Sequence, residues 1–312
     1  MRQPSSPETS TRDTRRTRMP KILVCDPLSE AGLDILRLAG EVSVRLNLDG
    51  RELAEAVADA AAIVVRSSTR IDGPVIEAAP QLMVIARAGV GVDNIDVATA
   101  TRCGVLVVNS PLGNTLAAAE HTIGLMLAAA RRIPQAAATM KSGGWDRKAF
   151  IGRQLFQKTL GLVGLGKVGS EVARRAAAFG MRVIAQDPYV TEQHAAAVGA
   201  ELVSTLEQLV DEADYISLHC ALTPDTRGLI SAAVLELMKP DAVVLNCARG
   251  GLVDEQALLT ALREHRIGGA ALDVFEQEPT TNMELLALDN VIATPHVGAS
   301  TEEAQDAVAV DA

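Results

Sequence analysis

The sequence predicts an α/β protein built from two doubly wound parallel-sheet domains. Short runs rich in Val, Ile, Leu and Ala alternate with stretches of helical periodicity, and this alternation stops once, at a long helix and a polar segment, before it restarts. Continuous apolar runs are typical of parallel strands, because helices cover both faces of such a sheet. A chain of 312 residues also exceeds the length, roughly 250 residues, at which one core usually gives way to two.

The first alternation covers residues 20–109. Its predicted strands are KILVCD, EVSVRL, AAIVVRSS, LMVIARAG and VLVVNS, and helical segments such as AGLDILRLAG and RELAEAVADA lie between some of them. A long helix is predicted over 114–132, because the pattern begins after Pro111 and Gly113 and stops before Pro134. We expect this helix to cross from the first domain to the second.

The second alternation follows the polar segment KSGGWDRKAFIGRQLFQ, which carries the single Trp of the chain. Its predicted strands are TLGLVGLG, MRVIAQD, DYISLHCAL, DAVVLNCARG, GGAALDVF and VIATPH. The two alternations share no fixed repeat period, so a solenoid is excluded.

The composition argues against several kinds of partner. Lys and Arg total 29 and Asp and Glu total 39, so the formal charge is −10 at pH 7, which disfavours nucleic-acid binding. The longest uncharged apolar stretch, near residues 122–130, is too short to cross a bilayer, so no membrane partner is expected. Residues 1–19 lack the apolar core of a secretory signal and are expected to form a disordered tail.

The cysteines point to a reducing compartment. The four residues form no C-x-x-C pair, and most lie in or beside apolar runs, so we expect reduced thiols in a cytoplasmic protein. Neither Cys nor His occurs in pairs at metal-ligand spacing, so no metal site is expected.

The strongest single motif is GLGKVG at residues 164–169. It follows the apolar run TLGLV and opens a helical stretch, which is the context that a dinucleotide-binding turn requires. Its glycines allow a tight turn and a close approach to a pyrophosphate, and the helix N-terminus offers N–H donors. A glycine turn that only tightens helix–strand packing is the alternative interpretation.

The next predicted strand ends in Asp187, 18 residues after Gly169. A carboxylate at this position can accept hydrogen bonds from the ribose hydroxyls and repels a 2′-phosphate. The expected cofactor is therefore NAD rather than NADP.

Arg249 lies in the stretch NCARGGLVDE, just beyond the strand DAVVLNC. The carboxyl ends of strands in an open α/β sheet face the ligand crevice. A guanidinium between such a strand and two glycines suits a substrate carboxylate, which it can hold with two hydrogen bonds. An ordinary surface arginine is the alternative.

His296 follows the last predicted strand, and Glu278 precedes it by 18 residues. An enzyme that oxidises an alcohol needs a group to take the hydroxyl proton, and a His suits that role near pH 7. A neighbouring carboxylate would fix its tautomer. Together with a dinucleotide site these residues form a candidate proton relay, although a single His is more often structural.

Taken in order, several segments resemble the D-isomer-specific 2-hydroxyacid dehydrogenases. They are VRSST, ARAGVGVDNID, SPLGNTLAAAEHTIGLMLAAAR, GLGKVG, LHCALTPDTRGLI, NCARGGLVDEQAL, ALDVFEQEP and TPHVGAS. The resemblance covers nearly everything from residue 20 to residue 305, and MKSGGWDRKAFIGRQL is most similar to the D-3-phosphoglycerate dehydrogenase branch of the family.

The resemblance implies a flavodoxin-like substrate-binding domain, made of residues 20–109 and 298–312, and a Rossmann NAD-binding domain at 110–297. A hinged cleft is expected between them, and dimer contacts are expected on the NAD domain. The implied assembly is a homodimer or homotetramer.

The resemblance also assigns site residues. It implies a catalytic trio in which Arg249 holds the substrate carboxylate, Glu278 orients His296, and His296 is the acid/base. The implied NAD-binding positions are Val90, Gly164, Gly166, Lys167, Val168, Gly169, Asp187, Cys220, Cys247, Asp273, His296, Gly298 and Ala299. The implied or hypothesised substrate-binding positions are Arg66, Ser67, Gly91, Asn114, Arg147 and Arg249.

Two departures from the family pattern qualify the assignments. Cys220-Ala221 stands where many relatives have Thr-Pro, so the contact expected there is made partly by the backbone. Cys247 replaces a small hydroxyl residue, and it is either a thiol near the cofactor or a packed residue at the strand end. The chain also stops at Ala312, and a final helix that looks short suggests a fragment of a longer protein. Serine regulation cannot be argued from it.

Three functions follow as hypotheses. The first is NAD-dependent oxidation of 3-phosphoglycerate to 3-phosphohydroxypyruvate, which begins serine synthesis. The second is reduction of glyoxylate or hydroxypyruvate, or another D-2-hydroxyacid dehydrogenase activity. The third is of another class, an NAD-sensing corepressor-like protein that binds peptides; the low aromatic content and the complete trio favour an enzyme.

Overall fold

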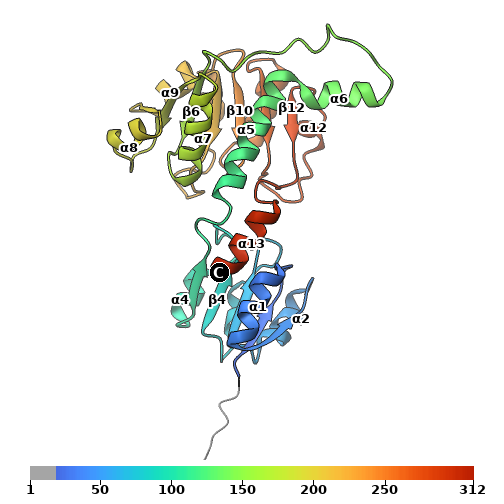
Figure 1. Ribbon diagram of the computed structural model, residues 1–312, viewed down its shortest axis with the longest axis vertical. Helices are drawn as coiled ribbons and strands as arrows, with labels where there is room; N and C mark the ends of the chain where they lie inside the picture. Colours follow the sequence, from blue (N-terminus) through green and yellow to red (C-terminus); the bar gives the residue numbers. More distant parts are fainter. Residues whose placement is uncertain (1–18) are drawn as a thin grey trace, which may run out of the picture. The chain divides into compact units, whose positions relative to one another are not determined.

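The computed structural model describes residues 19–312, which form two compact α/β units (Figure 1). The first unit runs to Ser110 and includes Ala309–Ala312, and the second unit is Pro111–Val308. Each unit contains one sheet in which all the described pairings are parallel, so the predicted fold class is confirmed. The predicted disordered tail lies outside the described residues except for Met19.

The sheet of the first unit has the strand order β2-β1-β3-β4-β5, which is the flavodoxin-like order. Its strands are β1 (Lys21–Val24), β2 (Glu41–Val44), β3 (Ala62–Val65), β4 (Val84–Arg87) and β5 (Leu106–Asn109). Its helices are α1 (Glu30–Ala39), α2 (Gly50–Val57), α3 (Gly73–Glu77) and α4 (Val97–Arg102). Apolar side chains of the strands are buried on both faces of the sheet.

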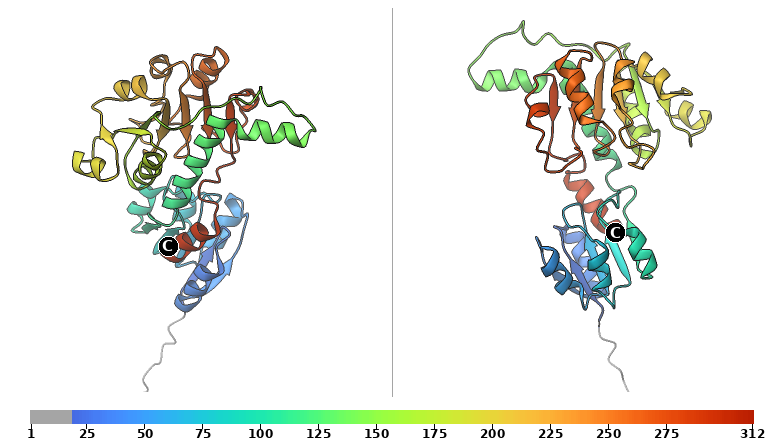
Figure 2. Two further views of the ribbon diagram at one scale, coloured as in Figure 1. Left: turned by 45° about the horizontal axis from the view of Figure 1, so that its top comes forward. Right: turned by 180° about the vertical axis from the view of Figure 1, so that it is seen from behind.

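The sheet of the second unit has the order β12-β11-β10-β9-β6-β7-β8, with helices on both faces (Figure 2). Its strands are β6 (Thr159–Val163), β7 (Arg182–Gln186), β8 (Glu201–Leu202), β9 (Tyr215–Leu218), β10 (Val243–Asn246), β11 (Gly269–Leu272) and β12 (Val291–Ala293). Its other helices, besides α5 and α6 below, are α7 (Lys167–Ala178), α8 (Glu192–Ala197), α9 (Leu206–Glu212), α10 (Ala232–Glu236), α11 (Glu255–Arg263) and α12 (Met283–Leu286). The chain reverses its winding direction between β6 and β9, and ligands bind at such switch points in Rossmann folds.

The long predicted helix is α5 (Thr115–Arg131), which begins and ends within one residue of the prediction. The helix α6 (Ile133–Lys141), which follows it, was not predicted, because Pro134 was interpreted as a stop signal. Pro134 lies in the first turn of α6, where no intrahelical partner exists for the missing N–H. Arg132, with a left-handed φ of 51°, separates the two helices.

The last helix, α13 (Glu302–Asp311), ends in the first unit. Ser110 Oγ donates a hydrogen bond of 2.8 Å to Asp311 Oδ2. Gly32 of α1 lies so close to Ala309 that a Cβ on the glycine would be 2.7 Å from the alanine Cβ. The chain thus returns to the first unit at Ala309, whereas the first domain was expected to include residues 298–312.

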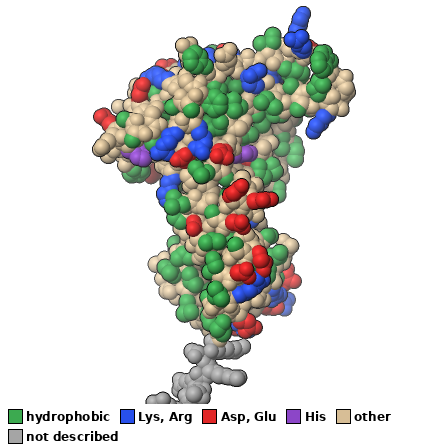
Figure 3. All heavy atoms as spheres, viewed as in Figure 1, with side chains coloured by type: hydrophobic (Ala, Val, Ile, Leu, Met, Phe, Trp, Pro, Cys, Tyr) green, Lys and Arg blue, Asp and Glu red, His purple; other side chains and the backbone are tan. Residues whose placement is uncertain are grey.

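Charged side chains of both signs lie on the surface. On the face drawn in Figure 3, Lys and Arg side chains are interspersed with Asp and Glu instead of gathering into one basic field. Among residues 19–312 no helix is both long enough and apolar enough to cross a membrane.

Candidate functional site

The glycine motif forms the turn between β6 and α7. Gly164 has a left-handed φ of 95°, and a Cβ there would lie 2.8 Å from the backbone carbonyl of His219. At Gly169 a Cβ would lie 2.4 Å from the carbonyl oxygen of Gly164. At Gly166, by contrast, a Cβ would meet open space. The first and third glycines are therefore required by packing, and the second leaves the start of the helix accessible.

The N-terminus of α7 is suited to an anion. Gly166 is its N-cap residue, and no side chain caps the helix, so the N–H groups of its first turn have no such partner. Aligned peptide dipoles place a positive partial charge at this end. The open surface at Gly166 and these donors together fit the pyrophosphate of a dinucleotide.

Asp187 follows β7 and joins this strand to the glycine turn. Its Oδ2 accepts a hydrogen bond of 2.8 Å from the N–H of Leu165, and its Oδ1 accepts one of 2.9 Å from the N–H of Tyr189. Each carboxylate oxygen can accept a second hydrogen bond. The carboxylate is therefore held in one orientation and retains acceptor capacity for a ribose.

His219 and Cys220 follow β9, on the other side of the glycine turn. Burial lowers the pKa of His219 to about 4, and its Nε2 lies 2.8 Å from Ser217 Oγ. Burial likewise raises the pKa of the Cys220 thiol. Both groups are thus uncharged at pH 7, and they support the turn without adding charge to it.

Cys247 is another uncharged thiol, at the end of β10. Burial raises the pKa of this thiol to about 12, because the effect of desolvation is larger than the lowering effect of the hydrogen bond with Thr122. A thiol with this pKa is a poor nucleophile at neutral pH. Packing at the strand end therefore describes Cys247 better than reactivity does.

Arg249 follows β10 and is held by the buried side chain of Asn246. The Asn246 Nδ2 donates to the carbonyl of Arg249 at 2.8 Å, and its Oδ1 accepts from the N–H of Ala248 at 3.1 Å. A Cβ at Gly250 would lie 1.7 Å from the carbonyl oxygen of Phe275, so only glycine fits there. Asn246 was not predicted as part of the site, although its place at a strand end next to CARGG was a usable signal.

Glu278 and His296 form the central pair of the site. His296 Nδ1 lies 2.6 Å from Glu278 Oε2, and Glu278 Oε1 accepts a hydrogen bond of 3.1 Å from the N–H of Phe275. Burial alone would raise the pKa of Glu278, but the hydrogen bond and charge of His296 and the Phe275 N–H lower it below its usual value. An ionised carboxylate can only accept, so His296 Nδ1 carries the hydrogen, and Nε2 is left for proton exchange.

Asp273 follows β11 and supports the turn that carries His296. It is 1% exposed, and its Oδ1 accepts hydrogen bonds from Thr294 Oγ1 at 2.6 Å and from the N–H of Val297 at 2.8 Å. Its Oδ2 accepts from the N–H of Gly298 at 2.8 Å, and His121 Nε2 of α5 lies 3.2 Å from Oδ1.

The balance at this carboxylate favours its charged form. Burial alone would raise the pKa of Asp273, but the hydrogen bonds from His121, Thr294 and the two backbone N–H groups outweigh it, so the net pKa is lowered. The predicted contact of Asp273 with the cofactor stays a prediction. The partners described for its oxygens belong to the chain itself.

The site candidates of the first unit lie at the carboxyl ends of two adjacent strands. Arg66 and Ser67 follow β3, and Val90 and Gly91 follow β4. The Arg66 N–H donates to the buried carboxylate of Asp26, at the boundary between β1 and β3 where the winding direction changes. The structure brings these four residues to one edge of the first sheet, and it brings the three predicted catalytic residues to one edge of the second.

The remaining candidates lie at the start of α5, in the segment after α6 and in the turn after β12. Asn114 is the N-cap residue of α5 but makes no side-chain capping bond. Arg147 is exposed in the segment after α6, close to Trp145, which is 78% exposed. Ala299 follows Gly298 in the turn that Asp273 supports.

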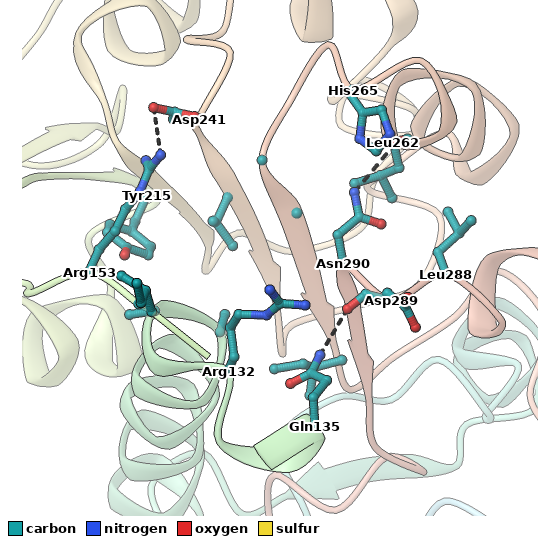
Figure 4. A pocket seen from close by; sticks show the side chains of 18 of the residues that line it. Arg132, Gln135, Arg153, Tyr215, Asp241, Leu262, His265, Leu288, Asp289 and Asn290 are labelled. Carbon is teal, nitrogen blue, oxygen red and sulfur yellow. Dashed lines mark hydrogen bonds and ion pairs between the residues drawn. The ribbon is translucent and has the colours of Figure 1, made fainter. Parts of the chain in front are cut away.

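A hollow of about 580 Å³ lies at the opposite, amino-terminal edge of the second sheet (Figure 4). It opens where β9, β10, β11 and β12 begin, and Arg132 and Gln135 line one side of it. Arg153 forms an ion pair of 2.6 Å with Asp241 there, and Gln135 Nε2 donates to the carbonyl of Asp289 at 2.9 Å. The catalytic candidates follow the carboxyl ends of these strands, so this hollow is separate from their site.

Metal ions have no evident place in the described part of the chain. No group of three or more His, Cys, Asp or Glu residues between residues 19 and 312 is arranged to hold one.

The fold and the site define a dinucleotide-binding protein of the dehydrogenase kind, and sequence comparison identifies the family. Residues 123–298 match the family described as D-isomer specific 2-hydroxyacid dehydrogenase, NAD binding domain. The chain belongs to this family, as its resemblance implied.

Two curated relatives are about half identical to the chain over the region that they match. It is 55% identical over 289 residues to D-3-phosphoglycerate dehydrogenase of Methanocaldococcus jannaschii, covering 93% of this chain and 55% of that protein. It is 52% identical over 293 residues to D-3-phosphoglycerate dehydrogenase of Synechocystis sp., covering 94% of this chain and 53% of that protein. The chain thus spans about half the length of these relatives.

Solved structures confirm the fold. The TT0316 protein of Thermus thermophilus has a TM-score of 0.86 and 39% identity, with 93% of each chain covered. An NADPH-dependent glyoxylate/hydroxypyruvate reductase of Sinorhizobium meliloti, in complex with NADP and malonate, has a TM-score of 0.84 and 32% identity, covering 93% of this chain and 90% of that one.

The lowered pKa of Asp273 predicts a pH-dependent stability difference between the wild type and Asp273→Asn. The ionised carboxylate contributes stability above its ordinary pKa of 3.8, and that contribution is lost as the pH falls through the lower pKa of the folded state. In urea unfolding, the free energy of unfolding of the wild type should therefore exceed that of Asp273→Asn by a large amount at pH 7 and by a smaller amount at pH 3. Asp211→Asn, at an exposed position of α9, is the control and should change stability by less than about 0.5 kcal/mol. A gap that widens in acid would contradict the assignment.

Proposed function

We propose that the chain is the catalytic part of an NAD-dependent D-3-phosphoglycerate dehydrogenase. The reaction converts 3-phosphoglycerate to 3-phosphohydroxypyruvate, the first step of serine synthesis. The observation that carries the proposal is the Glu278–His296 pair, whose 2.6 Å contact is at the same edge of the sheet as the glycine turn. The substrate is inferred from the names of the curated relatives, which are 46% to 55% identical to this chain.

The residues of the trio have separate roles in this proposal. Arg249 binds the substrate carboxylate, because its guanidinium offers a planar pair of donors and its loop is fixed by Asn246. His296 Nε2 accepts the proton of the C2 hydroxyl, and Glu278 stabilises the imidazolium that results. NAD supplies the two-electron oxidant at C2 when it is bound.

A second candidate is reduction of glyoxylate or hydroxypyruvate. The specific observation in its favour is the likeness to the Sinorhizobium meliloti reductase, with 93% of this chain covered. The relay would serve either reaction, since His296 can return a proton in the reductive direction. An NAD-sensing corepressor remains the alternative of another class, and it would not require turnover at all.

We also propose that the protein acts in the cytoplasm as a homodimer. Support for the dimer comes from residues 133–156, where Ile133, Met140, Trp145, Ile151 and Phe156 are each more than half exposed. Clusters of exposed large apolar side chains are typical of interaction sites, and a second copy of this segment would cover them. Arg147 of that segment would then reach the partner subunit's site. Support for the cytoplasm comes from the four cysteines, which are all unpaired.

Replacement of His296 by Asn tests the proposed enzyme directly. Acid/base assistance contributes about 10²–10⁴-fold, so kcat for phosphohydroxypyruvate reduction should fall by that factor while NADH binding persists. The measurement is steady-state absorbance at saturating substrate, together with NADH fluorescence titration. Glu278→Gln should lose less activity and change the pH profile. A His296→Asn enzyme with nearly full kcat would refute the relay.

Cofactor preference is predicted to depend on Asp187. The wild type should turn over NADH faster than NADPH, because a 2′-phosphate placed beside this carboxylate is repelled. Asp187→Ala should weaken NADH use and narrow the difference between the two cofactors. Equal kcat/KM for both cofactors in the wild type would remove the basis for this assignment.

Arg66 is proposed to bind the substrate phosphate and so to separate the two candidate reactions. A charge-assisted hydrogen bond contributes about 1.5–3 kcal/mol, or roughly one to two decades in affinity. Arg66→Ala should therefore raise the KM for phosphohydroxypyruvate by that factor and affect hydroxypyruvate less. Arg51→Ala, on an α2 side chain that is 90% exposed, should change neither value. Equal losses on both substrates would favour the glyoxylate or hydroxypyruvate reductase.

A further inference from the structure

His121 makes a specific contact with the turn that carries His296. It lies on α5, its side chain is 22% exposed, and its Nε2 is 3.1 Å from Thr294 Oγ1 and 3.2 Å from Asp273 Oδ1. No catalytic or binding role is predicted for it from the sequence. Its contacts with the site come from residues more than 150 positions later in the chain.

The hydrogen bonds determine which atom of this cluster donates. The hydroxyl of Thr294 has one hydrogen, and that hydrogen is given to Asp273 Oδ1 at 2.6 Å. Between His121 and Thr294 the donor must therefore be the imidazole, so Nε2 carries a hydrogen. His121 thus donates toward Thr294 Oγ1 and Asp273 Oδ1 together.

The carboxylate that receives this donor is buried and holds several groups of the turn. Asp273 is 1% exposed, and among its described hydrogen-bond partners His121 is the only side chain able to carry a positive charge. Burying a carboxylate with too few hydrogen-bond donors costs free energy, so the His121 donor helps to keep Asp273 in place. The other groups that bind Asp273 are in turn positioned by it. Those partners are Thr294 and the N–H groups of Val297 and Gly298.

The turn held by Asp273 has a strained backbone at the catalytic position. His296 has a φ of 53°, in the left-handed region that non-glycine residues rarely adopt. Its N–H donates to the carbonyl of Asp273 at 2.9 Å. At Gly298 a Cβ would be 3.0 Å from Asp273 Oδ2 and 3.7 Å from His121 Cδ2, so the turn closes directly over this pair.

We propose that His121 is a positioning residue for the dehydrogenase reaction, which through Asp273 and Thr294 holds the His296 turn in its strained, productive conformation. The inference rests on the proposed acid/base role of His296. His121 in this way connects α5, through Asp273 and Thr294, to the turn that carries the reacting imidazole. His121 itself does not contact the substrate or the cofactor in this proposal.

Two substitutions of His121 separate positioning from bulk packing. His121→Leu removes the donor, and His121→Gln retains an N–H that can reach the position of Nε2. We expect kcat to fall about 10- to 100-fold in His121→Leu, with the KM for NADH within about threefold of wild type, because misplacement of a reacting group by about 1 Å can cost about 10²-fold. His121→Gln should restore kcat to within about threefold of wild type.

A matched control accounts for lost stability. Thr205→Ala removes the N-cap of α9 in the same unit, which typically costs about 0.5–2 kcal/mol, and should leave kcat unchanged. If His121→Leu fails to fold, Thr294→Val removes the linking hydroxyl at nearly constant volume and should still lower kcat by about 3- to 10-fold. Wild-type kcat in a folded His121→Leu or in Thr294→Val would overturn the inference, as would an equal loss in His121→Gln.

A spectroscopic measurement distinguishes this inference from the proposed function. The chain has five histidines, so the ring signals of His296 in a ¹³C-labelled protein can be assigned by their loss in His296→Asn. These signals should move in His121→Leu and stay in place in Thr205→Ala. Unmoved signals would overturn the positioning role even if His296 is catalytic, whereas moved signals with full activity in His296→Asn would leave the link intact and refute only the acid/base assignment.

Discussion

The parallel direction of the strands is the constraint on which the site of the second unit depends. Because β6, β9, β10, β11 and β12 run in the same sense, the loops after them all emerge at one edge. The glycine turn and the three residues of the trio, which span more than 130 positions of the chain, are thereby brought to the same side. The winding switch between β6 and β9 separates the loops there and leaves room for a dinucleotide.

Polar groups buried at the strand ends convert this common edge into a defined geometry. Backbone N–H groups of the loops that carry the functional side chains donate to three such groups, which are Asn246 at the end of β10, Asp273 after β11 and the partly buried Glu278. Such groups are costly to bury unless their hydrogen bonds are made, so each one stabilises a single loop conformation. The positive φ at His296 persists because the surrounding bonds outweigh its strain.

Membership of the D-isomer specific 2-hydroxyacid dehydrogenase family agrees with this arrangement. The family description names NAD, whereas two structural relatives, an acyclic imino acid reductase and a glyoxylate/hydroxypyruvate reductase, were solved with NADPH or NADP, so one fold accommodates different substrates and both cofactors. Specificity therefore has to arise from side chains placed on the shared framework, and Asp187 and Arg66 are the two for which we propose a response to the charge of a phosphate group. The curated relatives, of which the chain spans about half, retain further length beyond this framework.

The sequence by itself determined the two α/β units, the long helix α5 and the glycine turn, because hydrophobic periodicity and glycine spacing are local properties of the chain. It did not reveal α6, where a proline compatible with a helix start was taken as a stop. Only the tertiary structure decided that Asn246 supports Arg249, that the Glu278–His296 pair expected from the sequence makes its contact, and that His121 reaches Asp273. The last two contacts join residues far apart in the chain, and hydrogen bonds of that kind depend on which strand ends the fold brings together, which no local pattern encodes.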